Sequence, residues 1–172
     1  MGNQTKAQGD ITLQSGGSTH IRASEVDSQK GNVNIVAKGD ISIEEGRQTN
    51  EYLLGAVEKG GGFLSRTKTQ RKEHVLTDRS VASDVTGKAV RILSGDNVTI
   101  KGSNVVSDER TAIGAEHDVK IVASTDSTLS QSEVHHKKSG LMGSGFGVTI
   151  GTQKVDTKSQ GAKESVSQSH VG

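Results

Sequence analysis

Histidine is the residue type in this sequence best suited to bind a metal ion, and two of its six copies, His135 and His136, are adjacent. Neighbouring residues on a strand point to opposite faces, so this pair cannot bind one ion without a turn between them. The sequence has no cysteine and no His-x-x-x-His spacing to complete a site. We therefore expect polar surface histidines and no metal ion.

Aspartates and glycines form two further patterns that could bind ligands. Asp10, Asp40 and Asp96 each follow a glycine, as in calcium-binding repeats, but the nine-residue Gly-Gly-x-Gly-x-Asp pattern is missing. Turn formation is the better interpretation of these aspartates. The segment 143–147, GSGFG, resembles a phosphate-binding loop, yet no Lys-Ser/Thr pair and no predicted helix follow it. A β-turn is expected there, and no cofactor.

Cationic side chains gather in two runs, 66–72 and 137–138. Such runs are often solvated faces, and binding of phosphate or lipopolysaccharide is the functional alternative. A nucleic-acid groove is not expected, because no aromatic residues are interleaved with the cations. Exposed aromatics in polar segments suggest contact surfaces. The predicted contact residues are Phe63, Arg66, Lys68, Lys137, Lys138 and Phe146.

Catalysis is not predicted. The carboxylates are scattered, no Ser/His/Asp arrangement stands out, and the three aromatic residues are too few for a carbohydrate groove. We expect no catalytic residue, although a β-helical polysaccharide-processing enzyme stays as a third alternative. With a net charge of +1, the chain has no overall field that would steer it to nucleic acid or membrane.

The positioning elements are short strands that begin at glycines. In residues 31–45, GNVNIVAKGDISIEE, apolar residues alternate with polar ones, which is typical of half-buried strands. Similar strands recur at intervals of 21 or 22 residues, a period typical of β-solenoids. The recurring pairs are Ile11/Val33, Ile21/Ile43, Ile92/Ile113, Val98/Val119, Ile100/Ile121 and Leu129/Ile150.

This period predicts an all-β fold, namely a right-handed parallel β-helix with rungs of about 21–22 residues and two excursions that leave the helix. Hydrophobic residues make up 30% of the chain, and Tyr52, Phe63 and Phe146 are its only aromatics. A narrow core of aliphatic ladders tolerates so few aromatics, whereas a compact core does not. Disorder is the competing interpretation of the many Gly, Ser and Lys residues.

Four segments follow from this pattern within one solenoid domain. Residues 1–46 and 87–133 are predicted rungs, residues 47–86 a first excursion, and residues 134–172 a second excursion with a tail. The first excursion is expected to be a hairpin or loop, and residues 51–57 could form either a short helix or a strand. The first 20 residues contain no apolar run typical of a signal peptide, and the chain is expected to be a fragment of a larger protein.

The strand pattern Gly-Asp/Asn-Val/Ile-x-Ile, together with the segment 136–151 (HKKSGLMGSGFGVTIG), resembles the haemagglutinin repeats of bacterial exoproteins secreted by the two-partner pathway. It is similar in particular to the toxin-proximal repeat region of contact-dependent growth inhibition proteins. The resemblance implies a non-enzymatic filament segment on or outside a Gram-negative cell, engaged in target-cell contact and toxin delivery. A generic adhesin stalk is the alternative. The implied partners are an outer-membrane component or glycan of a target cell, the protein's own outer-membrane transporter, and neighbouring rungs of the parent filament.

Overall fold

The computed structural model describes residues 2–144 and 147–172, and every regular element in these residues is a β-strand. No helix among them is long and apolar enough to cross a membrane. The strands form two compact units. The rung unit consists of residues 1–48, 78–126 and 164–172, and the hairpin unit consists of residues 49–77 and 127–163.

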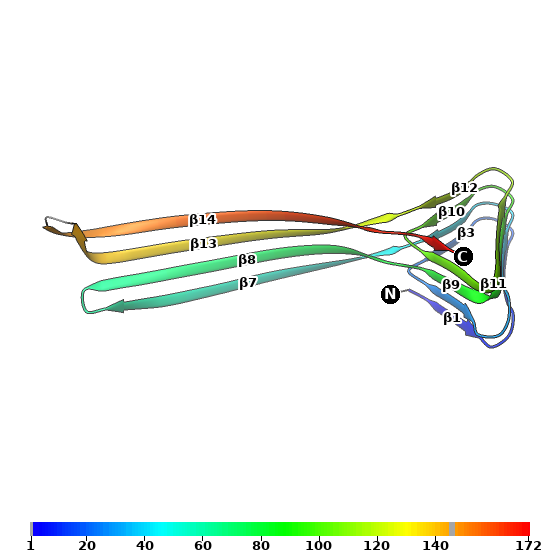
Figure 1. Ribbon diagram of the computed structural model, residues 1–172, viewed down its shortest axis with the longest axis horizontal. Helices are drawn as coiled ribbons and strands as arrows, with labels where there is room; N and C mark the ends of the chain where they lie inside the picture. Colours follow the sequence, from blue (N-terminus) through cyan, green and yellow to red (C-terminus); the bar gives the residue numbers. More distant parts are fainter. Residues whose placement is uncertain (1, 145–146) are drawn as a thin grey trace. The chain divides into compact units, whose positions relative to one another are not determined.

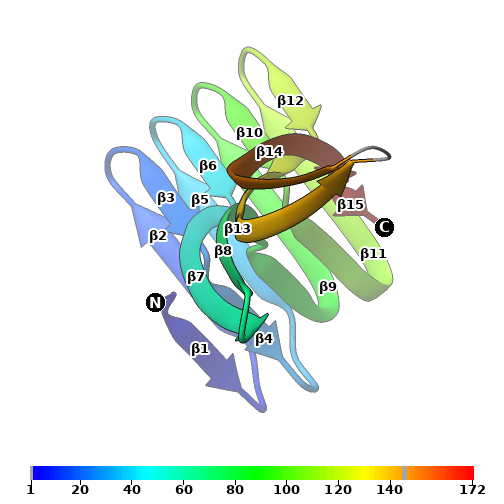
Figure 2. The same ribbon diagram turned by 90° about the vertical axis from the view of Figure 1, so that its left-hand side faces the viewer.

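Three series of parallel strands build the rung unit; each of the first four rungs contributes one strand segment to each series, and the last contributes β15 alone (Figure 1). The first series contains β1 (Gln4–Ala7), β4 (Glu25–Ser28), the beginnings of β9 (Asp84–Ser94) and β11 (Asn104–Ala115), and β15 (His170–Val171). The second contains β2 (Ile11–Ser15), β5 (Val33–Ala37) and the ends of β9 and β11. The third contains β3 (Thr19–Arg22), β6 (Ile41–Glu44), β10 (Val98–Lys101) and β12 (Val119–Val122). Figure 2 shows β1, β4, β9 and β11 side by side.

The strand registers confirm the predicted spacing for five of the six pairs. For example, Ile21 pairs with Ile43, and Val98 pairs with Val119. The sixth pair, Leu129 and Ile150, was a wrong prediction. These residues lie in β13 (Ser124–Ser144) and β14 (Gly147–Ser167), two successive strands of the antiparallel sheet, so their spacing of 21 is not a rung spacing.

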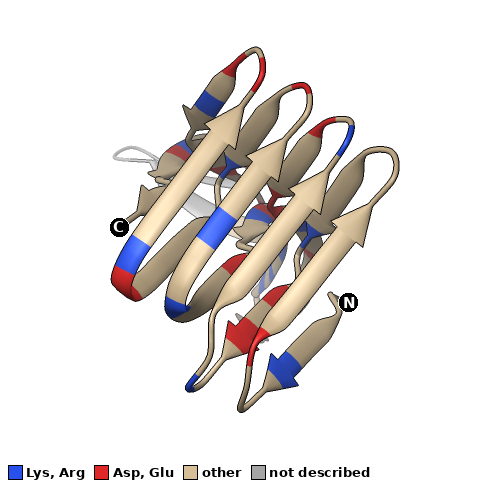
Figure 3. Ribbon diagram, turned by 90° about the vertical axis from the view of Figure 1, so that its right-hand side faces the viewer, with Lys and Arg blue, Asp and Glu red and all other residues tan. Residues whose placement is uncertain are grey.

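The core of the rung unit is a set of aliphatic ladders without aromatic residues. Each ladder residue stacks on its equivalent one rung away, and Ile35, Ile43, Ile92 and Ile100 are completely buried. Burial of one such side chain stabilises the fold by about 1.5–3 kcal/mol. The outer positions of the second series are almost uncharged, since β2 and β5 carry no charged residue (Figure 3). The core therefore depends on stacking, as the alternation of Val and Ile predicts.

A ladder of serines closes the corner between the third series and the next rung. At each of these corners, one serine hydroxyl donates to the carbonyl of the last residue of the third-series strand, at 2.6–2.8 Å. The same oxygen accepts an N–H from the neighbouring rung at 3.2–3.3 Å. The four serines are Ser24, Ser83, Ser103 and Ser169. This corner keeps its geometry whether one residue or a whole hairpin is inserted in it.

The hairpin unit is a four-stranded sheet in the order β14-β13-β8-β7. Strand β7 (Gly46–Gly62) turns at Phe63 and Leu64 into β8 (Ser65–Val81), so these two strands are antiparallel. Residues 51–57, for which helix and strand were both open, lie in β7 and are strand. The chain is thus all-β, with parallel sheets in the rung unit and antiparallel pairing in the hairpin unit.

Candidate functional site

The registers of the hairpin strands decide which side chains lie together. Between β8 and β13, the Leu141 amide donates to the Leu64 carbonyl at 3.2 Å, and Thr69 contacts His136 at 3.0 Å. Both contacts fit the same antiparallel register. In that register Lys68 lies opposite Lys137, one residue along from the pair Thr69 and His136. Residues opposite each other in antiparallel strands have Cβ atoms about 4.5–5.5 Å apart.

The same stepping extends this pair into a row across the whole sheet. Between β13 and β14, His135 contacts Asp156 at 2.7 Å. In the register set by this pair, Lys137 lies opposite Lys154, two residues further along each strand. In the first hairpin, the two-residue turn at Phe63 and Leu64 places Lys59 opposite Lys68. Four neighbouring strands therefore each contribute one lysine at the same level. We call Lys59, Lys68, Lys137 and Lys154 the lysine row.

A second row on the same face of the same sheet shows how such charges are ordinarily balanced. Glu133 of β13 lies opposite Lys158 of β14, with a 2.8 Å ion pair, and opposite Lys72 of β8. The hydrogen bond from Lys158, followed by its charge, holds the pKa of Glu133 below its ordinary value, and Lys72 adds to this effect. Opposite charges alternate in this row, whereas the lysine row contains one sign only. Like charges directly opposite each other destabilise a sheet.

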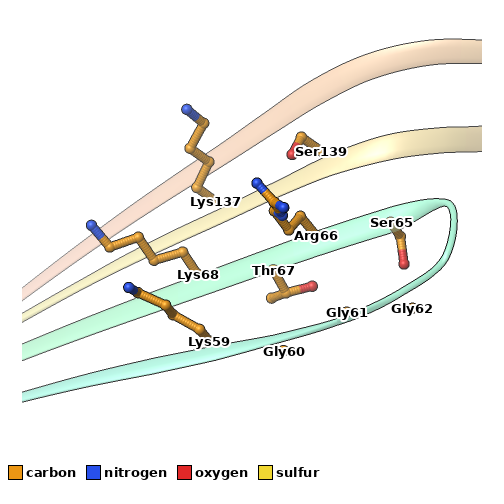
Figure 4. Close-up of a pocket in the computed structure, with 10 residues that line it drawn as sticks. All are labelled: Lys59, Gly60, Gly61, Gly62, Ser65, Arg66, Thr67, Lys68, Lys137 and Ser139. Atoms are coloured by element: carbon orange, nitrogen blue, oxygen red, sulfur yellow. The ribbon is translucent and has the colours of Figure 1, made fainter.

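A groove of about 760 Å³ lies over Lys59, Lys68 and Lys137 of the lysine row and contains no acidic residue in its lining. Lys59, Lys68 and Lys137 extend beside one another from three strands, and Arg66 lies two residues nearer the tip of the hairpin than Lys68 (Figure 4). None of these four cations forms an ion pair with another described residue. The remaining lining residues are small or hydroxylic, namely Gly60, Gly61, Gly62, Ser65, Thr67 and Ser139. Such a groove suits an anion with several charges, such as a phosphorylated surface group.

The predicted contact residues fall into three groups. Arg66, Lys68 and Lys137 line the groove, whereas Lys138 does not, because neighbouring strand residues point to opposite faces. Phe63 lies in the turn of the first hairpin and is fully exposed. Phe146 lies outside the described residues.

Sequence reasoning missed Lys59 and Lys154, which lie outside the two basic runs. The spacing carries a signal for both. Lys59 and Lys137 are 78 residues apart, as are Glu44 and Val122, which both pair with Lys101. Lys68 and Lys154 are 86 residues apart, as are Asp84 and His170, which both pair with Asn104.

The other candidate ligands have structural partners. Asp10 accepts a hydrogen bond from the Asn32 amide at 2.7 Å, and Asp40 accepts one from the Asn97 amide at 3.2 Å, so both link rungs at corners. The histidines of the hairpin unit bridge strands, as in the 2.7 Å contact between His74 and Glu51. Within the described residues, no three His, Asp or Glu side chains gather in a way that could hold a metal ion. Segment 143–147 includes residues outside the described part.

A buried carboxylate, Glu45, lies at the corner that precedes the first hairpin. Its Oε1 accepts hydrogen bonds from Ser124 at 2.8 Å and from Lys101 at 3.3 Å. Burial raises the pKa of Glu45, but the hydrogen bonds from Ser124, from its own backbone and from Lys101 together outweigh burial and lower that pKa. Glu45 is 5% exposed, and we assign it a structural role.

Comparison with known proteins identifies the repeats. The hemagglutinin repeat family matches residues 1–53 and 64–172. The chain is 33% identical over 145 residues to the "tRNA nuclease CdiA" of Escherichia coli, which covers 83% of this chain and 4% of that protein. It is 27% identical over 172 residues to the "tRNA nuclease CdiA-2" of Burkholderia pseudomallei, covering 99% of this chain and 6% of the relative. A "16S rRNA endonuclease CdiA" of Enterobacter cloacae is 32% identical over 143 residues, covering 81% and 4%. The chain therefore spans only a small part of the length of these relatives.

Proposed function

The chain belongs to the hemagglutinin repeat family, and from that premise we propose that it is a filament segment of a contact-dependent growth inhibition exoprotein, in which the hairpin unit engages anionic groups on the target cell. Its relatives are secreted Gram-negative cell-surface exoproteins, and this chain is a segment of one. The stretch that matches is the repeat region, a structural segment. We assign the nuclease activity named for the relatives to another part of those long proteins.

The rung unit serves as the scaffold in this proposal. Its three series of parallel strands support a right-handed parallel β-helix, in which each rung covers the aliphatic side chains of the previous one. In domain terms, we propose one solenoid domain in which two stretches of rungs alternate with two hairpin excursions. The parent protein would reach the cell surface through its own outer-membrane transporter, as two-partner secretion requires.

The observation that carries the proposed engagement is the uncompensated lysine row. Four opposed lysines cost stability in the absence of a ligand, and an anion bound in the groove removes that cost. Phosphate groups of the outer envelope of a Gram-negative target are the ligands of matching charge. Charge-assisted hydrogen bonds from several ammonium groups to one anion are among the stronger polar contacts in proteins.

Binding of the labelled chain to Gram-negative cells tests this proposal. The informative variant is Lys59→Glu/Lys137→Glu, which turns the lysine row into alternating charges like those around Glu133. This variant should fold at least as well as the parent sequence, yet lose most of its saturable binding. The control Lys30→Glu/Lys38→Glu makes the same change in net charge on exposed residues of the rung unit and should bind normally.

Two outcomes would contradict the proposal. Equal binding by the groove variant and the control would show that recognition lies elsewhere. No binding by any of the three proteins would favour the alternative of a passive adhesin stalk.

A further inference from the structure

The two hairpins are inserted at the same corner, two rungs apart. The first follows Glu44, the last residue of β6, and the second follows Val122, the last residue of β12; both residues are in register with Lys101. The chain returns before Asp84 and before His170, which are in register through Asn104. The corner between Lys101 and Asn104 carries no hairpin. One hairpin is therefore inserted for every two rungs.

The width of a hairpin matches this interval. Neighbouring strands of any sheet lie about 4.8 Å apart, so two rungs advance by about 9.6 Å. A hairpin contributes two strands and occupies the same width. Successive hairpins can consequently join into one sheet without a gap, and the contact between β8 and β13 shows that the two hairpins of this chain do so.

The outer strands β7 and β14 have a free edge in the described sheet. They are 17 and 21 residues long and contain no proline. Proteins usually protect an edge strand by making it short, by bending it, or by placing proline or charged residues, especially lysine, in it. Of these devices, β7 and β14 carry charge, for example at Lys59 and Lys154, but neither is short and neither contains proline. Exposed aliphatic side chains lie on both strands, namely Leu53, Leu54 and Val57 on β7 and Ile150, Val155 and Val166 on β14.

We propose that the free edge of β14 pairs in antiparallel orientation with β7 of a second copy of this chain, in the register that joins β8 to β13. In the parent filament, the hairpin of the next two-rung repeat would take the place of the second copy. The pairing continues an interface already present within the chain, because β14 is equivalent to β8 and β7 to β13. In this register Lys154 lies opposite Lys59 of the second copy, so the pairing lengthens the lysine row by one more pair of like charges, a cost that the backbone hydrogen bonds of the new strand pair must outweigh.

The rung registers predict which residues meet at this interface. Equivalent residues in the first strands of the two hairpins, β7 and β13, are 78 positions apart, the interval between Glu44 and Val122. Equivalent residues in the second strands, β8 and β14, are 86 positions apart, the interval between Asp84 and His170. The contact between Thr69 and His136 then corresponds to Val155 opposite Glu58 of the second copy. Thr69 and His136 lie five positions from the hydrogen-bonded pair Leu64 and Leu141, so they form a non-hydrogen-bonded pair. Side chains in such pairs approach most closely, which suits a disulfide.

Disulfide trapping tests this register directly, because the chain contains no cysteine. The Glu58→Cys and Val155→Cys variants are prepared separately, mixed at high protein concentration and oxidised mildly. We expect a disulfide-linked dimer of the two variants. The matched control is Leu54→Cys mixed with Val155→Cys, because position 54 is exposed on the same face of β7 but four residues out of register, which is about 13 Å.

Cross-linking of Val155→Cys to Glu58→Cys well above the control supports the proposed pairing. Equal cross-linking in both mixtures, or only Val155→Cys homodimers, would overturn it. Binding of the uncross-linked chain to cells is measured separately, so failure of this interface and failure of the proposed target engagement remain distinguishable.

Discussion

Reversing the charge of Lys68 should stabilise the hairpin unit, although surface substitutions usually have little effect or destabilise. Lys68 lies between Lys59 and Lys137, and Lys68→Glu converts two repulsive cross-strand pairs into attractive ones. A cross-strand charge pair contributes roughly 0.2–1 kcal/mol, and exposed pairs fall in the lower part of that range. The free energy of unfolding of the hairpin unit should therefore rise by about 0.5–1.5 kcal/mol.

Lys72→Glu is the matched control, since Lys72 lies four residues away on the same strand and face. This change places a glutamate opposite Glu133 and leaves the lysine row intact. It should lower the free energy of unfolding by about 0.5–1 kcal/mol. The two variants have the same net charge, so a general effect of charge would change the free energy of unfolding of both in the same direction.

Tyrosine fluorescence provides the assay. The only tyrosine, Tyr52, lies in β7 within the hairpin unit, so its emission during urea unfolding reports on that unit. The opposite shifts should shrink in 1 M salt, where the Debye length is about 3 Å. Shifts of the same sign, or shifts that salt does not reduce, would refute the register on which the lysine row rests.

Three further predictions concern the rung unit. Ile43→Ala removes a completely buried side chain from an aliphatic ladder and should cost about 2–5 kcal/mol in urea unfolding followed by circular dichroism; a cost below 1 kcal/mol would contradict the packing. Ser83→Ala leaves the Glu44 carbonyl without its hydroxyl donor and should cost about 1–3 kcal/mol, with faster hydrogen exchange of the Ser24 amide as the local signature. Because the folded pKa of Glu45 is lowered, its stabilising contribution is present above the unfolded pKa of about 4.3 and is lost as pH falls through the folded value, so Glu45→Gln should flatten the acid side of the stability profile. An unchanged acid limb in Glu45→Gln would exclude Glu45 as a source of that dependence.

The rungs could be predicted from sequence because their physics is local and repetitive. A strand with one buried face requires apolar and polar residues to alternate. Stacking of the rungs requires this pattern to recur at a constant interval, as it does between Val98 and Val119. The interval alone is ambiguous, however, because Leu129 and Ile150 show it by coincidence within a hairpin. The serine ladder could not be found in this way. Insertion of the hairpins separates Ser24 from Ser83 and Ser103 from Ser169, so these serines follow no constant spacing in a serine-rich sequence.

Some residues of the candidate site could be selected from the sequence, but their arrangement could not. The basic runs drew attention to Arg66, Lys68 and Lys137, which line the groove. Strand alternation alone separates Lys137 from Lys138, once both are known to lie in one strand. Lys59 and Lys154 are isolated in sequence, and only the cross-strand register brings them to the level of Lys68.

The contrast between two rows of one sheet argues against a merely solvated basic face. A solvated face has no reason to align its charges, and the row around Glu133 shows that this sheet can alternate charges where strands meet. The lysine row instead places one cation on every strand, at equivalent positions of both hairpins. A single substitution in either hairpin would relieve part of the repulsion, so the arrangement is costly unless something else compensates it. We propose that an anion spanning several strands provides that compensation, and its length would grow with the number of hairpins joined edge to edge.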